Sequence, residues 1–337
     1  MKKRLQSLTF LEYHRFKSFT KKRKTHKYRL LRWKKSGKVF KNTPKTIRLD
    51  APIDFSVFSN YEAVFSFVDK ANRIRESKQY ISINLENVRN LSNEAIVILL
   101  SIMYNFVGDN LGVVAKAPLD FTVNDKLDKS GFFEYMNGAN ASERNKKAFN
   151  KIHTKNSKEV DSEFTDKILQ QATTTIWGDK RGNEDIQRVF VELMMNTNKH
   201  ADPDNEASET WWLSAEHDEK NKKVSFAFVD NGVGILESID KLAYKQGKFK
   251  ELKALIKNDK DLLKDIMEGK LKSRTGLSFR GKGLPASLKA FQRNSFSKFT
   301  IVTNGVYADF ENNTFKTLYS KFSGTLIFFE LSQENNN

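Results

Sequence analysis

The stretch Lys223-Val-Ser-Phe-Ala-Phe-Val-Asp230-Asn231-Gly232-Val-Gly234-Ile235 leads from a nearly continuous apolar segment into a carboxylate and two glycines. A short apolar run bounded by glycine predicts a buried β-strand. A carboxylate at the end of a strand can accept a hydrogen bond from an exocyclic amine, and glycines let the backbone approach a flat ligand closely. Asp, Asn and Gly also form ordinary turns, so a simple turn is the alternative for this motif taken alone.

A second motif lies upstream, where the spacing of apolar residues predicts a helix over 184–201. At about 100° per residue, Glu192, Asn196, Lys199 and His200 lie on one side of this helix and the apolar residues on the other. A carboxylate can orient or deprotonate a water, and an amide oxygen suits Mg²⁺. The alternative is an amphipathic helix with a solvated face.

A third motif lies downstream, where glycines and basic residues precede a predicted helix over 286–291. Glycines before a helix N-terminus expose backbone N–H groups in a favourable dipole, which is typical of a phosphate site. A lone pair of glycines also occurs in ordinary loops. The residues of the motif are Arg280, Gly281, Lys282, Gly283 and Leu284.

In this order, the three motifs make residues 165–332 resemble the GHKL ATPases, which include histidine kinases, anti-sigma-factor kinases and gyrase-type and mismatch-repair-type ATPases. Glu192 and Asn196 resemble the N box of that family. The stretches 230–234 and 281–284 resemble its two glycine boxes, and Gly324-Thr325 resembles its final conserved pair. The resemblance implies an α/β sandwich in which helices back a mixed sheet.

The resemblance also implies ATP and Mg²⁺ as cofactors. Asn196 would then ligate Mg²⁺, and Glu192 would be the catalytic general base if hydrolysis occurs. Asp230 would bind the adenine amine, and residues 281–284 would bind the phosphates. The remaining residues expected at the nucleotide are Lys199, His200, Asn231, Gly232, Gly234, Arg280 and Thr325.

The segment between Gly234 and Arg280 is unusually long for a connection, at 45 residues. Its sequence is rich in Lys, Glu and Asp and predicts helix over about 236–270. Long segments between functional motifs are often movable lids or partner surfaces. We therefore expect a long ATP lid that is available to a protein partner.

The middle of the chain, 49–138, predicts a smaller α/β unit, with helices over 57–75 and 93–107 and strands over 80–85 and 112–116. The order of these elements resembles a STAS domain, the fold of anti-sigma-factor antagonists. In signalling STAS domains, a phosphorylatable serine begins the second helix in an Asp-Ser-Gly setting. Ser92 stands in the place of the aspartate here, and Asn93 and Glu94 replace the serines, which argues against a phospho-switch. An ordinary α/β domain without STAS kinship is the alternative.

The C-terminal part, 162–332, begins with a helix predicted over 164–177 and ends in strands. One predicted pair is 210–216 with 223–230. A second pair, 299–303 with 306–310, flanks an Asn304-Gly305 turn, and a last strand covers 324–331. The polar stretch 139–161 is the predicted linker between the two folded parts.

The positive charge of the chain is confined to its first residues. Residues 1–48 hold 18 Lys and Arg and one acid, whereas the remaining 289 residues hold 40 basic and 40 acidic side chains. A basic arm of this density attracts polyanions. The arm can serve nucleic acid, an acidic protein or a membrane surface, and a merely solvating terminus is the alternative.

Composition excludes several classes of site. The chain has no cysteine, so disulfides and thiolate metal sites are excluded. Its longest nearly apolar run, 95–108, is too short to span a bilayer, and no apolar segment of a secretory signal follows the basic N-terminus. We expect a cytoplasmic, bacterial, regulatory protein without a transmembrane segment.

Three functions are compatible with these features. The first is an ATP/Mg²⁺-binding conformational switch or slow ATPase, in which the STAS-like unit and the arm engage partners. The second is a serine or histidine protein kinase that acts on a separate regulatory protein. The third is an ATP-controlled nucleic-acid-binding protein, and the sequence leaves a homodimer open in each case.

Overall fold

The computed structural model describes residues 45–130, 132, 152–155, 160–200, 210–256, 258–277 and 283–335. The chain divides into two compact units, Met1–Pro44 and Lys45–Asn337. The first unit lies outside the described residues and contains most of the predicted basic arm. Most of the predicted linker also lies outside them. The following description concerns the second unit.

The N-terminal part of this unit contains a parallel sheet with the order β1-β3-β5. Two long helices, α3 and α4, follow β2 and β4, which pair with each other in parallel. The elements are β1 (Thr46–Asp50), β2 (Asp54–Phe55), α3 (Val57–Glu76), β3 (Tyr80–Asn84), β4 (Asn90–Leu91), α4 (Asn93–Gly108), β5 (Val113–Lys116) and α5 (Phe121–Lys129). The helices and strands predicted over 57–116 are therefore present, and β1 begins at Thr46, inside the segment that the sequence assigns to the arm.

The C-terminal part contains a sheet of four long strands and one short edge strand, in the order β6-β7-β8-β10-β9. Every described pairing in it is antiparallel, so the mixed sheet implied by the family resemblance is wrong for the described strands. The reason is the connectivity, because short turns join β7 to β8 and β9 to β10, and such hairpins are antiparallel. The strands are β6 (Ile152–Lys155), β7 (Trp211–Asp218), β8 (Lys223–Asp230), β9 (Ser297–Asp309) and β10 (Thr314–Ser332).

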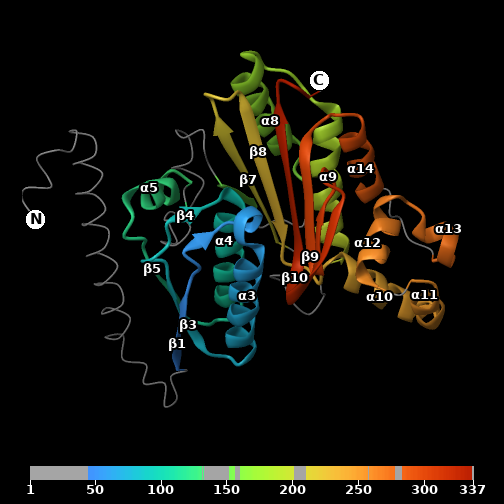
Figure 1. Ribbon diagram of the computed structural model, residues 1–337, viewed down its shortest axis with the longest axis horizontal. Helices are drawn as coiled ribbons and strands as arrows, with labels where there is room; N and C mark the ends of the chain where they lie inside the picture. The colour runs from blue at the N-terminus through green and yellow to red at the C-terminus, as the bar shows by residue number, and fades with distance from the viewer. Residues whose placement is uncertain are drawn as a thin grey trace, which may run out of the picture. The chain divides into compact units, whose positions relative to one another are not determined.

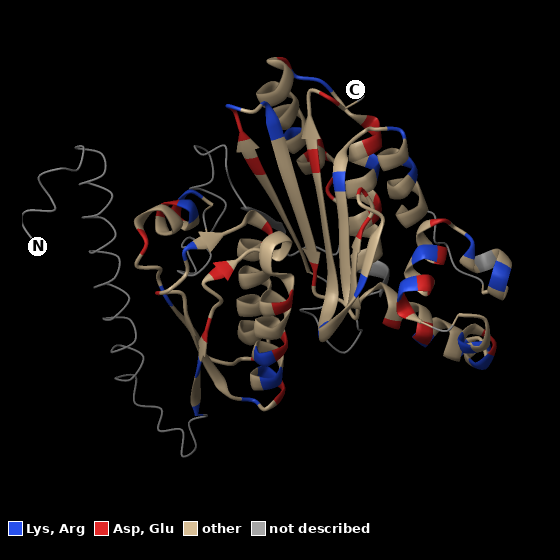
Figure 2. Cartoon of the chain, viewed as in Figure 1, with Lys and Arg blue, Asp and Glu red and all other residues tan. Residues whose placement is uncertain are grey.

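Helices of the C-terminal part cover one face of this sheet, and the predicted long helical lid is four short helices in the described residues (Figure 1). The lid helices carry both signs of charge, as Figure 2 shows. The helices are α8 (Ser162–Trp177), α9 (Glu184–His200), α10 (Ile235–Lys245), α11 (Phe249–Leu255), α12 (Asp259–Met267), α13 (Leu271–Thr275) and α14 (Gly283–Gln292). None of the described helices is both long and apolar enough to cross a membrane.

The antiparallel sheet is buried on both faces. Trp211, Phe226 and Phe329 belong to a core with α8, α9 and α14, whereas their sequence neighbours Trp212, Ala227 and Phe328 belong to a core with α3 and α4. Successive residues of a strand point to opposite faces, so one strand contributes to both cores. The two parallel helices α3 and α4 thus lie between the parallel and the antiparallel sheet.

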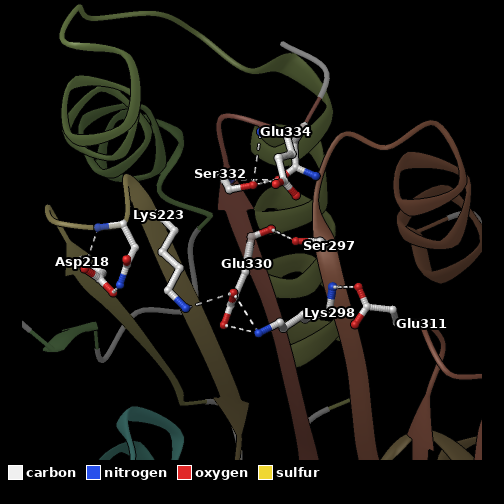
Figure 3. Close-up of polar contacts among 10 residues, drawn as sticks. Asp218, Lys223, Ser297, Lys298, Glu311, Glu330, Ser332 and Glu334 are labelled. Atoms are coloured by element: carbon white, nitrogen blue, oxygen red, sulfur yellow. Dashed lines mark hydrogen bonds and ion pairs between the residues drawn. The ribbon is translucent and has the colours of Figure 1, made fainter.

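Charged side chains fix the register at one end of the antiparallel sheet (Figure 3). The Glu330 carboxylate on β10 lies 3.6 Å from Lys223 Nζ on β8 and 3.3 Å from Lys298 Nζ on β9. Ser297 Oγ also donates to the Glu330 carbonyl at 3.2 Å. One carboxylate therefore connects three adjacent strands.

The predicted turn at Asn304-Gly305 is wrong, because β9 runs through it as one strand to Asp309. Asn304 has a φ of 52°, and the pairing of β9 with β10 is irregular opposite it. The hairpin turn falls instead after Asp309, where Asn312 N donates to Asp309 Oδ1 at 3.0 Å. Strand β10 consequently begins ten residues before the predicted 324–331 strand.

Candidate functional site

Asp230 ends β8 at the centre of the antiparallel sheet, between Trp211 on β7 and Thr325 on β10. Directly opposed residues in antiparallel strands share a face, so Asp230 and Thr325 lie on the face that carries Trp211 and the α8–α9 core. Gly232 N donates to Asp230 Oδ1 at 2.8 Å, and the Thr325 side chain also hydrogen-bonds this carboxylate. The first glycine motif and the Gly-Thr pair, nearly 100 residues apart in sequence, therefore meet at one carboxylate.

Burial raises the pKa of Asp230 to about 6, although hydrogen bonds from Gly232 and Thr325 lower it. At neutral pH, Asp230 is consequently an ionised acceptor held in a water-poor environment. The carboxylate already accepts hydrogen bonds from Gly232 N and from the side chain and backbone of Thr325, and a ligand amine would be a further donor to it.

Gly324 permits this close arrangement. Its φ is 115°, a backbone conformation that glycine adopts without penalty. A Cβ atom at this position would meet the Asp230 carbonyl oxygen. A side chain at residue 324 would thus displace the strand end that carries Asp230.

The loop after Asp230 is held from both sides. Asn231 Nδ2 donates to Thr210 Oγ1 at 3.0 Å, and the Asn231 side-chain oxygen accepts from Ser101 Oγ on α4. On the other side, Asn304 Nδ2 donates to the Val233 carbonyl at 2.8 Å. The loop conformation is therefore set by residues that are distant in sequence.

The N-terminus of α10, directly after Gly234, is already capped. Thr303 Oγ1 accepts from Ile235 N at 2.9 Å, and Asn304 Oδ1 accepts from Leu236 N at 3.1 Å. A Cβ at Gly234 would meet the Asn304 side chain, which explains the glycine there. Because these N–H donors are occupied, phosphate groups would need donors from another element.

Helix α9 carries two of the predicted polar site residues, Glu192 and Asn196. Its apolar face, including Phe190, Leu193 and Met194, is buried as predicted, while Glu192 and Asn196 are partly exposed. Among the described residues, neither Glu192 nor Asn196 has a side-chain hydrogen bond or ion pair.

The second glycine motif adjoins Glu192 on α9. Gly283 begins α14 and packs on α9 so closely that a Cβ would lie 2.7 Å from Glu192 Oε2. Leu284 packs against the core beside it. The start of α14 and the carboxylate of the predicted base are therefore neighbours, although more than 90 residues separate them in sequence.

Several predicted residues cannot be placed. Arg280, Gly281 and Lys282 lie outside the described residues, and the side chains of Lys199 and His200 do too, although their backbone belongs to α9. Within the described part of the chain, no group of three or more His, Asp or Glu side chains could hold a metal ion. Mg²⁺ needs no such group where phosphates and waters supply most ligands, so an amide such as Asn196 suffices in that case.

Three residues that shape the loop were not predicted from the sequence: Ser101, Thr303 and Asn304. Thr303 and Asn304 were interpreted as the end of a strand and a turn, and Ser101 as part of a buried helix. An Asn-Gly pair within an apolar segment was the available signal, since Asn readily adopts a positive φ. Their long-range hydrogen bonds have no sequence pattern.

Comparison of the chain with protein-family models, with curated proteins and with solved structures gives no match.

Proposed function

We propose that the chain binds ATP with Mg²⁺ on the face of its antiparallel sheet that α8, α9 and α14 cover, and that it acts as a GHKL-type switch or slow ATPase. The observation that carries this proposal is the meeting of motifs that are distant in sequence. Asp230 meets Thr325, and Glu192 meets Gly283. The first contact follows from the pairing of β8 with β10, and the second from the packing of α14 on α9.

The donor and acceptor groups suit the ligand. Asp230 would supply an ionised acceptor for the adenine amine, since burial raises its pKa only to about 6. Asn196 would hold Mg²⁺, whose charge assists phosphoryl chemistry when it is bound. Glu192 would orient or deprotonate a water, which is the role of a general base. Residues 280–284 would bind the phosphates through backbone N–H groups.

The structure also bears on the kinase alternative. His217, the one histidine that precedes an acid, lies on β7 with its Nδ1 2.7 Å from Thr175 Oγ1 on α8. Burial lowers the pKa of His217. A side chain held in this way is a poor phosphoacceptor, so self-phosphorylation on His217 is disfavoured. A kinase that acts on a separate protein and a nucleic-acid partner for the arm both stay predictions.

Calorimetry with a non-hydrolysable ATP analogue and Mg²⁺ tests the proposal. Asp230→Asn keeps the size of the side chain but replaces one acceptor oxygen with a donor, and binding should be lost. Asp218→Asn, at the opposite end of the same hairpin, is the matched control and should bind like the wild type. Equal affinity of the Asp230→Asn and wild-type chains would exclude this pocket.

A further inference from the structure

Helix α4 carries one hydroxyl in the middle of its buried apolar segment. The helix packs on β7 and β8 from the side of the sheet opposite α9, and every residue over 95–103 except Ser101 is apolar. Ser101 is itself buried. A serine hydroxyl inside a helix often bonds to the carbonyl one turn earlier. Ser101 Oγ instead donates to Asn231 Oδ1, so it is directed to the loop after Asp230.

The side chain of Asn231 is held at both ends of its amide. Its Nδ2 donates to Thr210 Oγ1 at 3.0 Å, and its backbone N donates to the Thr210 carbonyl at 3.2 Å. Of these contacts and the one with Ser101, only the last comes from the N-terminal part of the unit. Asn231 is therefore fixed by the start of β7 and, across the sheet, by α4.

Fixing Asn231 also fixes a hydrogen bond to the carboxylate beside it. Gly232 N donates to Asp230 Oδ1 at 2.8 Å. The direction of this N–H is set by the peptide plane between Asn231 and Gly232, because that plane is rigid. A rotation of Asn231 would therefore turn the donor away from Asp230. Thr325 would still hold the carboxylate, so the effect is a weakening of the arrangement and not its loss.

We propose that Ser101 is a positioning residue of the nucleotide site, which fixes Asn231 and, through it, the Gly232 N–H that orients the Asp230 carboxylate. The inference rests on the proposed function for its ligand, whereas the contacts that carry it are present without nucleotide. It makes α4, and with it the N-terminal α/β part, a component of the site that sets the affinity for nucleotide.

The same pair of elements offers a matched control. Ser214 Oγ on β7 donates to Asn93 Oδ1 at the start of α4. Ser101→Ala and Ser214→Ala therefore each remove one buried hydroxyl and one serine-to-asparagine hydrogen bond between α4 and the antiparallel sheet or its loop. Ser214 lies opposite Ala227 in the middle of the hairpin, away from the loop. A merely structural role for Ser101 would give the two variants the same behaviour.

Two measurements on the full chain test the proposal. Amide hydrogen exchange without nucleotide reports on the loop, and calorimetry with a non-hydrolysable ATP analogue and Mg²⁺ reports on the site. Ser101→Ala should speed exchange at Gly232 and weaken analogue binding about three- to tenfold, the effect of one lost hydrogen bond. Ser214→Ala should match the wild type in both. In an Asn231→Ala background, adding Ser101→Ala should not speed exchange further, because the contact is already absent.

Equal exchange at Gly232 in Ser101→Ala and Ser214→Ala would overturn the proposal, and so would additive effects of Ser101→Ala and Asn231→Ala. Faster exchange with unchanged analogue affinity would overturn the role of Ser101 at the nucleotide site. A wild-type chain that binds no analogue would refute the proposed function alone. The exchange measurements would then still decide whether Ser101 positions the loop.

Discussion

Replacing Asp230 with Asn should stabilise the folded chain at neutral pH. The pKa of this carboxyl group rises from 3.8 to about 6 on folding, because the group is buried. The folded state consequently binds the proton more tightly than the unfolded state. At pH 7 the buried carboxylate costs the folded state about 3 kcal/mol, since each pKa unit corresponds to about 1.4 kcal/mol.

Asparagine removes this cost because it carries no charge, but it offers one acceptor oxygen in place of two. Gly232 N or the Thr325 hydroxyl would then lose its acceptor, at about 1 kcal/mol. The expected net gain at pH 7 is about 1–2 kcal/mol in the free energy of unfolding. The cost of the wild-type carboxylate is absent below pH 3.8, grows as the pH rises to 6 and is complete above 6. The advantage of the variant should therefore be about 1 kcal/mol smaller at pH 5 than at pH 7.

Urea unfolding of both chains, without nucleotide and at pH 5 and 7, measures this difference through tryptophan fluorescence. Asp218→Asn is a control of opposite sign, because hydrogen bonds from Asn221 lower the pKa of Asp218. Asp218 thus stabilises the folded state above its unfolded pKa, and its replacement should destabilise the chain at pH 7. The reasoning would be refuted if Asp230→Asn were less stable than the wild type at pH 7. It would also be refuted if the difference in the free energy of unfolding between the two chains were the same at pH 5 and pH 7.

Three further outcomes are expected. Glu192→Ala should retain the ATP analogue in calorimetry but lower any phosphate release about 10²–10⁴-fold, and unchanged turnover would remove the residue from catalysis. Gly324→Ala should lower the free energy of unfolding by about 1–3 kcal/mol or more, because the φ of residue 324 is 115° and the new Cβ would meet the Asp230 carbonyl. Gly305→Ala is the control, because a Cβ there has open space and should change the free energy of unfolding little in the same urea titration. Similar losses in both variants would contradict the close-approach argument. Deleting residues 1–44 leaves β1 intact and should preserve the affinity for the ATP analogue. The deletion should abolish salt-sensitive binding of oligonucleotides, measured by fluorescence anisotropy. If the full-length protein binds no oligonucleotide at low salt, a nucleic-acid role for the arm is excluded.

The spacing of apolar residues predicted the helices and strands that bury either one face or all of their side chains. Helix α9 shows this, since Ile186, Phe190, Leu193 and Met194 recur at helical spacing and all lie in the core. Strand β8 was also predicted within its observed bounds, 223–230. In both cases local sequence and tertiary packing favour the same structure.

The errors arise where tertiary contacts override local preference. Asn304-Gly305 has the sequence of a hairpin turn, yet the Asn304 side chain binds the loop before α10 and the strand continues. Strand β6 lies inside the predicted linker, because its polar sequence gives no strand signal and its pairing with β7 supplies the structure. Neither contact is encoded within a few residues of the element it changes.

The second core of the sheet was also beyond sequence reasoning. A strand buried on both faces is apolar throughout, and this pattern does not reveal what covers each face. The sequence thus predicted that β8 is buried but not that α3 and α4 cover the face opposite α9. For the site, the types of residue were predictable, and the pairing of Asp230 with Thr325 follows only from the strand order β8-β10.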